Sequence, residues 1–260
     1  MLAIIGGTGL TNLANLEITR REIVRTPYGE PSGPLTFGRI DHTEIIFLAR
    51  HGYGHTIPPH EVNYRANIWA LKTTGVTRIL AVNSVGGIAA DAGPGMLVVP
   101  DQLIDYTHSR KHTFFEGQEQ PVTHIDFTLP YCENARSLYL QAARALSIEV
   151  RAGGVMGVTQ GPRLETIAEI NRMEREGCAL VGMTGMPEAA LAREAELSFA
   201  ALALVMNHAA GRGSSLTGIR LQDAEDILKS GMEKVRHLLA KAVELHGALP
   251  ANQQGLEGIA

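Results

Sequence analysis

Residues 157–207 decide the fold and read GVTQGPRLETIAEINRMEREGCALVGMTGMPEAALAREAELSFAALALVMN. Two apolar runs typical of strands, 179–183 and 198–206, each follow a segment of helical period, and a third such run, 150–156, precedes the first helix. This alternation predicts a β-α-β-α-β unit with parallel strands, because parallel neighbours need a crossover connection. The sequence therefore indicates an α/β protein.

Chemically distinctive residues follow each of these three strands. They are Gly161 to Glu165 after the first, Gly182 to Thr184 after the second, and Asn207 with His208 after the third. In open α/β sheets, ligands bind outside the carboxyl ends of the strands. We therefore expect a ligand site where these three ends meet.

Composition limits the classes of function. The chain has 260 residues, 45% of them hydrophobic, which is enough for a sizeable core. A net charge of −4 without a long run of Lys and Arg argues against a nucleic-acid partner. The apolar run at the N-terminus is too short for a signal or membrane helix. Cys132 and Cys178 are far apart and indicate reduced thiols in a cytoplasmic protein. We expect one domain over 1–260, with 247–260 as a mobile tail.

Three other predicted strands also end in groups that can bind an anion. Residues 2–5 lead to a glycine-rich turn at Thr8, 44–49 lead to Arg50 and His51, and 78–82 lead to a small-residue loop over 83–87 that includes Asn83 and Ser84. Gly7 and Gly9 match part of a dinucleotide-binding fingerprint, but Asn12 occupies its third glycine position and no convincing helix follows. An ordinary turn and a solvated Arg–His pair remain open as alternatives.

The remaining elements are predicted from periodicity alone. Strands are expected at 22–28, 35–40, 97–100 and 102–106, and helices at 59–74, 131–146 and 221–245. Residues 108–128 form a long polar loop rich in histidine. Its histidines lack the spacing of metal ligands, so we expect no metal site there. Long loops of this kind are often functional or contact a partner.

Glu165 and Asn207 offer a carboxylate and an amide, which together can bind the edge of a heterocycle through acceptors and donors. Met183 adds an apolar surface between them and the anion-binding groups. An anion site joined to a heterocycle site suggests a nucleoside or nucleotide ligand, and the chain has no triphosphate-binding loop. The ordinary alternatives are a helix N-terminal charge for Glu165 and a cap for Asn207.

Several motifs recur in the order found in one known family. They are IIGGTGL from Ile4, FLARHGYGHTIPPHEVNYRANIWAL from Phe47, GPRLETIAE from Gly161, GMTGMPEAALARE from Gly182, and the strand end at Asn207. On these motifs, which span residues 2–246, the sequence resembles the trimeric purine nucleoside phosphorylase / methylthioadenosine phosphorylase family. The resemblance implies a mixed, partly barrel-like β-sheet flanked by helices. It also implies phosphorolysis, in which phosphate attacks the anomeric carbon of a purine nucleoside and releases the base.

The resemblance assigns roles to individual residues. It implies a phosphate site of Thr8, Arg50, His51, Ser84 and Thr184. It implies catalytic roles for Asn207 and Glu165, and substrate contacts from Asn83, Leu164, Met183, His55, His124, Ala224 and Ile227. Leu164 stands where relatives have a base-stacking Phe, and His124 matches a residue that reaches into a neighbouring subunit, which implies a homotrimer. Inorganic phosphate is the co-substrate, and no cofactor is expected.

Two features suggest which nucleoside is cleaved. Asn207 and Glu165 match relatives that act on 6-oxopurines, while Ala224 and Ile227 would form a small apolar pocket for a 5′-methylthio group, with His55 supporting that branch. We therefore expect phosphorolysis of 5′-methylthioinosine. The alternatives are an inosine/guanosine phosphorylase, a methylthioadenosine phosphorylase, a nucleosidase that uses water, and a nucleoside-binding protein without turnover.

Overall fold

A computed structural model describes residues 1–260 except 11–12, 14, 118–120, 221–223, 251–252 and 255–260. The described strands are β1 (Leu2–Gly6), β2 (Glu17–Glu22), β3 (Leu35–Ile40), β4 (Thr43–Ala49), β5 (Arg78–Gly87), β6 (Leu97–Val99), β7 (Gln102–Asp105), β8 (Val150–Ala152), β9 (Val155–Val158), β10 (Cys178–Gly182) and β11 (Ser198–His208). The described helices are α1 (Tyr64–Thr73), α2 (Glu133–Leu146), α3 (Ile167–Arg175), α4 (Gly185–Glu194) and α5 (Ala224–Gly247), with a short 3-10 turn at Gly213–Ser215.

One mixed sheet joins all these strands, and β5 is its centre. The main path runs β2-β3-β4-β1-β5-β10-β9-β7, and a side branch leaves β5 in the order β11-β6-β8. β5 pairs in parallel with β1 and β11 and antiparallel with β10. The predicted mixed α/β sheet is therefore confirmed.

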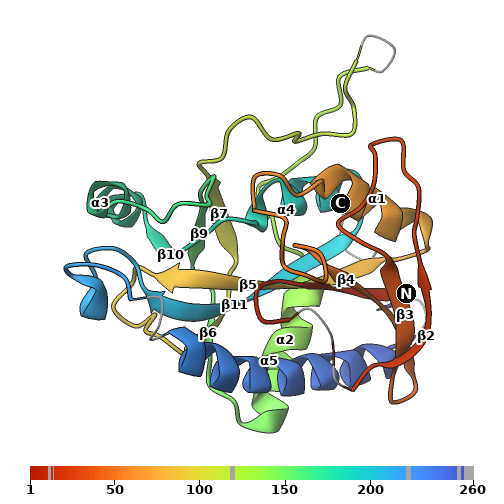
Figure 1. Ribbon diagram of the computed structural model, residues 1–260. Coiled ribbons are helices and arrows are strands. Elements are labelled where there is room, and N and C mark those ends of the chain that lie inside the picture. The colour runs from red at the N-terminus through yellow and green to blue at the C-terminus, as the bar shows by residue number, and fades with distance from the viewer. Residues whose placement is uncertain (11–12, 14, 118–120, 221–223, 251–252, 255–260) are drawn as a thin grey trace.

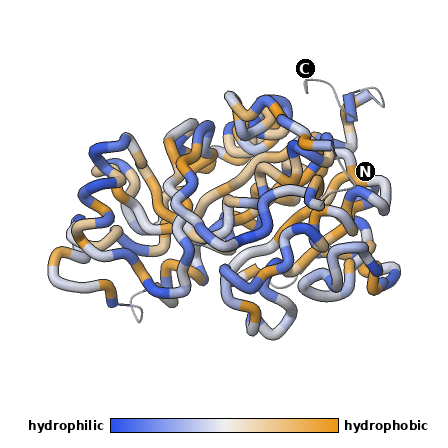
Figure 2. Tube along the Cα trace, turned by 90° about the horizontal axis from the view of Figure 1, so that it is seen from above, coloured by the Kyte–Doolittle hydropathy of each residue, from blue (hydrophilic) through white to orange (hydrophobic). Residues whose placement is uncertain are grey.

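Helices cover both faces of the sheet, with α1 and α4 on one side and α2 and α5 on the other (Figure 1). Successive strand residues point to opposite faces, so Ala3 and Ile5 pack with α1 and α4, whereas Leu2 and Ile4 pack with α2 and α5. Strands buried on both faces read as nearly continuous apolar runs rather than alternating ones. Long hydrophobic stretches accordingly run through the molecule, with hydrophilic stretches between them (Figure 2).

The predicted strands at 179–183 and 198–206 exist as β10 and β11, but the expectation that all three strands run parallel is wrong. β9 and β10 are parallel, as the crossover through α3 requires. β10 then pairs antiparallel with the far end of β5, while β11 runs parallel to β5 along its length. The carboxyl ends of β10 and β11 therefore approach the same end of β5 from opposite directions.

Other boundaries also differ from the prediction. The expected loop at 83–87 is the continuation of β5, which pairs with β11 through Gly87. A Cβ at Gly87 would lie 1.7 Å from the Ala92 carbonyl oxygen, so glycine permits a close approach here rather than a turn. The expected strand at 22–28 lies instead at Glu17–Glu22, and the run 150–156 divides into β8 and β9 at two glycines with positive φ.

The last helix runs along the sheet, and its C-terminal end lies where β5 begins, with His246 beside Arg78 (Figure 1). The predicted helix at 221–245 is α5, and residues 221–223 fall outside the described residues. In the predicted tail, the carbonyl of Gln253 accepts a hydrogen bond from Arg78 and that of Gln254 accepts one from Thr77. No helix in the described part of the chain is long and apolar enough to cross a membrane.

Candidate active site

A cavity of about 550 Å³ lies where the ends of β1, β4, β5, β9, β10 and β11 converge. It brings together most of the residues singled out in the sequence, namely Thr8, Arg50, His51, His55, Ser84, Leu164, Glu165, Met183, Thr184 and Asn207. These strand ends therefore converge on one cavity, and its use as a ligand site stays a prediction. Among the described residues, no cluster of three or more His, Cys, Asp or Glu side chains could hold a metal ion.

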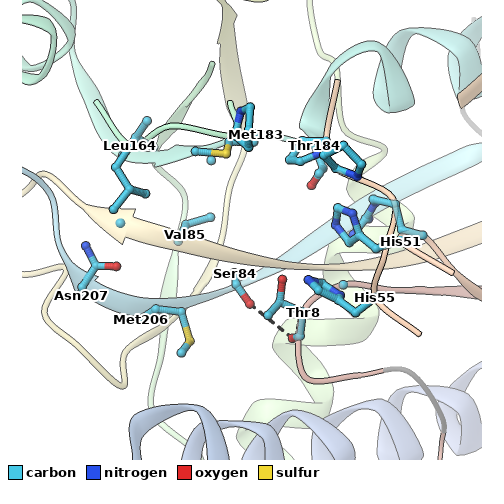
Figure 3. Close-up of a pocket in the computed structure, with 18 of the residues that line it drawn as sticks. Thr8, His51, His55, Ser84, Val85, Leu164, Met183, Thr184, Met206 and Asn207 are labelled. Atoms are coloured by element: carbon cyan, nitrogen blue, oxygen red, sulfur yellow. Dashed lines mark hydrogen bonds between the residues drawn. The ribbon is translucent and has the colours of Figure 1, made fainter. Parts of the chain in front are cut away.

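The cavity has two chemically different ends. Figure 3 shows Thr8, His51, His55, Ser84 and Thr184 gathered at one end, with Asn207 and Leu164 at the other and two methionines between them. The first end is rich in hydroxyl groups and imidazoles. The second offers a carboxamide and, from Glu165, a carboxylate.

A bulge in β11 places two consecutive residues on the cavity. The pairing of β11 with β5 shifts register between Val205 and Asn207. Neighbouring residues of a regular strand point to opposite faces, and a bulge re-aims a side chain that would otherwise point away. Both Met206 and Asn207 consequently line the cavity.

The Thr184 hydroxyl is held from behind by Asn83. Asn83 Nδ2 donates to Thr184 Oγ1 at 2.7 Å, and both side chains are buried. Because that bond uses the hydroxyl as an acceptor, its own proton remains available toward the cavity. Asn83 does not line the cavity, so the structure places it one layer behind the contact predicted for it.

Arg50 lines the cavity although its side chain is fully buried. Its Nε and Nη2 donate to the two carboxylate oxygens of Glu188 at 2.7 and 2.6 Å, and its Nη1 donates to the Val82 carbonyl at 2.9 Å. A guanidinium has five N–H groups, so each terminal nitrogen keeps one N–H. Burial alone would lower the pKa of Arg50, but the Glu188 carboxylate outweighs burial and raises that pKa. Arg50 therefore stays charged and rigidly oriented.

His51 is a neutral imidazole with one nitrogen committed. Its Nδ1 lies 2.8 Å from the Ile57 carbonyl oxygen, which can only accept, so Nδ1 carries the proton. Burial, followed by the neighbouring Arg50 charge, lowers the pKa of His51 to about 4. The His55 ring lies beside it, with 4.8 Å between ring centroids. At neutral pH the imidazole is therefore uncharged, and its Nε2 is free to accept a hydrogen bond from a ligand.

Glu165 is oriented by a hydroxyl and does not cap the adjacent helix. Thr159 Oγ1 donates to Glu165 Oε1 at 2.6 Å. The N-cap of α3 is Thr166, and Glu169 closes its capping box. Burial raises the pKa of Glu165 above its ordinary value. Glu165 therefore takes no part in capping α3, and its carboxylate is available to a ligand.

Asn207 keeps free hydrogen-bonding groups as well. Its Nδ2 donates to the His208 carbonyl at 2.7 Å. A primary amide has two N–H groups and a carbonyl oxygen, so one N–H and Oδ1 remain for a ligand. Asn207 and Glu165 both line the cavity, and both keep hydrogen-bonding groups for a ligand.

An apolar wall closes part of the cavity, and it differs in detail from the sequence prediction. Met206, Ile219 and Leu228 line it. Ile227 is not among the described residues that line the cavity, whereas its neighbour Leu228 is. α5 begins at Ala224, whose side chain falls outside the described residues. An aligned position one residue off on a helix turns by about 100°, which is enough to move a side chain off the cavity.

His124 lies apart from the cavity of its own chain. Its side chain is exposed, and the segment between β7 and α2 that carries it extends away from the body of the molecule (Figure 1). Several other residues around the cavity are not predicted from the sequence. Pro58 and Pro59 line it, and Glu188 fixes Arg50 from α4. The sequence does contain a signal for Glu188, because an acidic residue on a mainly apolar helix indicates a buried carboxylate that needs a partner.

The chain belongs to the phosphorylase superfamily, whose family model matches residues 1–244. The resemblance predicted from the motifs is thus confirmed, and with it the class of enzyme, a nucleoside phosphorylase.

Three individual proteins are similar to this chain over most of its length. The chain is 54% identical over 241 residues to a probable S-methyl-5′-thioinosine phosphorylase of Pseudomonas syringae pv. tomato, covering 93% of this chain and 97% of the relative. It is 44% identical over 251 residues to the 6-oxopurine nucleoside phosphorylase of Pyrococcus furiosus, covering 94% and 92%. A solved structure of methylthioadenosine phosphorylase from Schistosoma mansoni in complex with adenine superposes with a TM-score of 0.91 at 35% identity, covering 97% and 93%.

Proposed function

We propose that this protein catalyses the phosphorolysis of 5′-methylthioinosine to hypoxanthine and 5-methylthioribose 1-phosphate. One observation carries the proposal: a single cavity joins a hydroxyl-rich end, a carboxylate–amide end and an apolar wall. These three parts match a phosphate, a 6-oxopurine and a methylthio group. The similarity to the Pseudomonas syringae relative supports the same substrate.

The phosphate is proposed to bind the hydroxyl-rich end. Thr8, Ser84 and Thr184 offer hydroxyl or backbone donors, and Arg50 offers its two remaining N–H groups. Positioning the nucleophile beside the anomeric carbon turns a bimolecular attack into an effectively unimolecular one. The phosphate charge also stabilises the cationic character that develops on the sugar.

The base is proposed to lie between Glu165 and Asn207. As the glycosidic bond breaks, negative charge accumulates on the purine, and a fixed amide beside its five-membered ring stabilises that charge in the transition state. The Glu165 carboxylate can accept the ring N–H that a 6-oxopurine carries and adenine lacks. A site built to bind such an N–H rejects an analogue without it, because its buried acceptor is left unpaired.

A second candidate is a general phosphorylase for inosine and guanosine. The 44% identity to the Pyrococcus furiosus 6-oxopurine enzyme favours it. An apolar wall discriminates only modestly against a hydroxyl group, by about 10- to 200-fold. The two candidates therefore share the base site and differ only at the 5′ position of the sugar.

A substrate panel tests the proposal. Purified protein is assayed with methylthioinosine, inosine, guanosine and methylthioadenosine, each with and without phosphate, and the released base and sugar phosphate are quantified. We expect the highest kcat/KM for methylthioinosine and strict dependence on phosphate. Release of base without phosphate would indicate a nucleosidase, and binding without turnover would indicate a non-catalytic protein.

We also propose a homotrimer in the cytoplasm. The segment between β7 and α2 exposes His124 together with the apolar side chains of Val122 and Leu129, which suits contact with a neighbouring copy. Cys132 and Cys178 are both unpaired, as is usual in a reducing compartment. Sedimentation equilibrium should give three times the chain mass of 28.0 kDa. A monomer with full activity would contradict the assembly.

A further inference from the structure

Arg110 is a buried cation that lies outside the cavity and has no role in the proposed chemistry. Its residue is 8% exposed, and among the described residues the nearest interacting carboxylate, that of Asp105, acts on it only at a distance beyond an ion pair. Instead its guanidinium faces oxygen atoms from segments that are distant in the sequence. A buried charge is retained only where its surroundings compensate it, so these contacts are the reason for its position.

Two of those segments are the strand ends that carry the base-binding and sugar-binding groups. After β9, Arg110 Nη2 donates to the carbonyls of Gln160 at 2.8 Å and Thr159 at 3.3 Å. After β10, its Nη1 donates to the carbonyls of Met183 at 2.8 Å and Met186 at 2.5 Å. Thr159 orients Glu165, and Met183 lines the cavity.

A third wall is reached through Tyr64. Arg110 Nη1 lies 3.4 Å from the Tyr64 hydroxyl, and that hydroxyl donates to the Pro59 carbonyl at 2.8 Å. Pro59, which follows β4 in the sequence, also lines the cavity. One guanidinium is thereby connected to three walls of the same cavity.

We propose that Arg110 is a positioning residue that fixes the separation of the Glu165 and Met183 walls and so keeps the base and the sugar aligned for reaction. Only a planar fork of five N–H groups can reach carbonyls on both sides at once, and a lysine ammonium is a point charge that cannot. The expected effect on catalysis rests on the proposed phosphorylase function. The role of Arg110 in fixing the spacing of the two walls does not depend on that function.

The experiment compares Arg110→Lys with Arg136→Lys in the full chain. Arg136 is a matched control, because it is also 8% exposed and also donates to backbone carbonyls, those of Pro100 and Val99, which do not line the cavity. We expect kcat/KM for methylthioinosine to fall about 100-fold in Arg110→Lys, as for a misaligned reactant. The KM for phosphate should change much less, and Arg136→Lys should keep kcat/KM near wild type. Equal losses of activity in the two variants would overturn the proposal.

Amide hydrogen exchange gives a readout that needs no substrate. In Arg110→Lys, exchange should be faster in both 159–165 and 182–186, and in Arg136→Lys it should be unchanged there. If the wild-type protein shows no phosphorolysis, the proposed function fails while this measurement still decides the role of Arg110. If Arg110→Lys does not fold, Gln160→Leu replaces it, because Gln160 Oε1 accepts from Arg110 Nε at 3.1 Å. Unchanged exchange in a folded variant would refute the proposed spacing role.

Discussion

Arg50 and Glu188 form a completely buried ion pair, with side chains 0% and 1% exposed and a closest N–O distance of 2.6 Å. Arg50 follows β4, whereas Glu188 lies in the first turn of α4. Thr184 is the N-cap of the same helix. α4 therefore supplies both a hydroxyl at the cavity and the carboxylate that orients the Arg50 guanidinium behind it.

Replacing Glu188 by Gln should destabilise the protein and make it more dependent on phosphate. Removing one partner of a buried pair leaves an uncompensated charge and costs about 3–5 kcal/mol of unfolding free energy. Phosphate would supply the missing negative charge, so it should raise Tm more in Glu188→Gln than in wild type. Urea unfolding and thermal scans with and without phosphate measure both effects.

The control is Glu44→Gln, which breaks the exposed Arg39–Glu44 pair at 3.1 Å. An exposed pair contributes below about 1 kcal/mol, and it should show no special response to phosphate. Equal stability changes in the two variants would contradict the importance of the buried pair.

Exchanging the amide for carboxylates should alter the choice of base. Ala209 is buried and lines the cavity close to Asn207. In the double variant Asn207→Asp, Ala209→Asp, the new carboxylates can accept from an exocyclic amino group but cannot donate to a 6-oxo group. We expect the kcat/KM ratio of methylthioadenosine to methylthioinosine to rise by about 10-fold or more. The control, Asn207→Asp with Ala209→Asn, preserves size without the second charge, and an unchanged ratio in the double variant would argue against the proposed contacts.

The apolar wall should determine the preference at the 5′ position. Leu228 lines the cavity, and Leu228→Ser would give the sugar 5′-hydroxyl a polar neighbour while removing contact with a methylthio group. Loss of one such apolar contact corresponds to about 1–3 kcal/mol. We expect the kcat/KM ratio of methylthioinosine to inosine to fall by at least about fivefold. Ile227→Ser is the matched control on the same helix. A larger fall of this ratio in Ile227→Ser than in Leu228→Ser would contradict the assignment of Leu228 to the apolar wall.

Acid sensitivity should depend on His246, far from the cavity. Arg78 Nη1 donates to His246 Nδ1 at 2.8 Å, so the ring must be neutral there. Burial, then Arg78 and the N-terminal ammonium, lower the pKa of His246 to about 4. In the unfolded chain that pKa is about 6.5, so the unfolded state binds the extra proton between these values and stability falls as pH decreases from 6.5 to 4.

His246→Gln keeps an acceptor for Arg78 without a titrating group. It should reduce the loss of unfolding free energy between pH 6.5 and pH 4 by about 3 kcal/mol. His51 contributes a loss in the same direction, so the pH dependence is reduced rather than abolished. His237→Gln, at an exposed position of α5, should leave the slope unchanged, and an equal change there would contradict the prediction.

Much of the site was predictable because it lies at strand ends. The apolar runs located β1, β4, β10 and β11, and the residues just beyond them, among them Thr8, His51, Thr184 and Asn207, all line the cavity. Local periodicity and turn chemistry act over a few residues, so they can be read from the sequence. The family resemblance then connected these positions to one reaction.

The sequence by itself determined which side chains stand at the ends of the strands and which class of enzyme they serve. Only the tertiary structure decided that β10 approaches β5 from the opposite direction, that a bulge turns both Met206 and Asn207 inward, and that Arg50 is held by Glu188. It likewise placed Leu228 rather than Ile227 at the apolar wall. These outcomes depend on pairing and packing between segments up to 138 residues apart, and such long-range contacts leave no periodic signal in the chain.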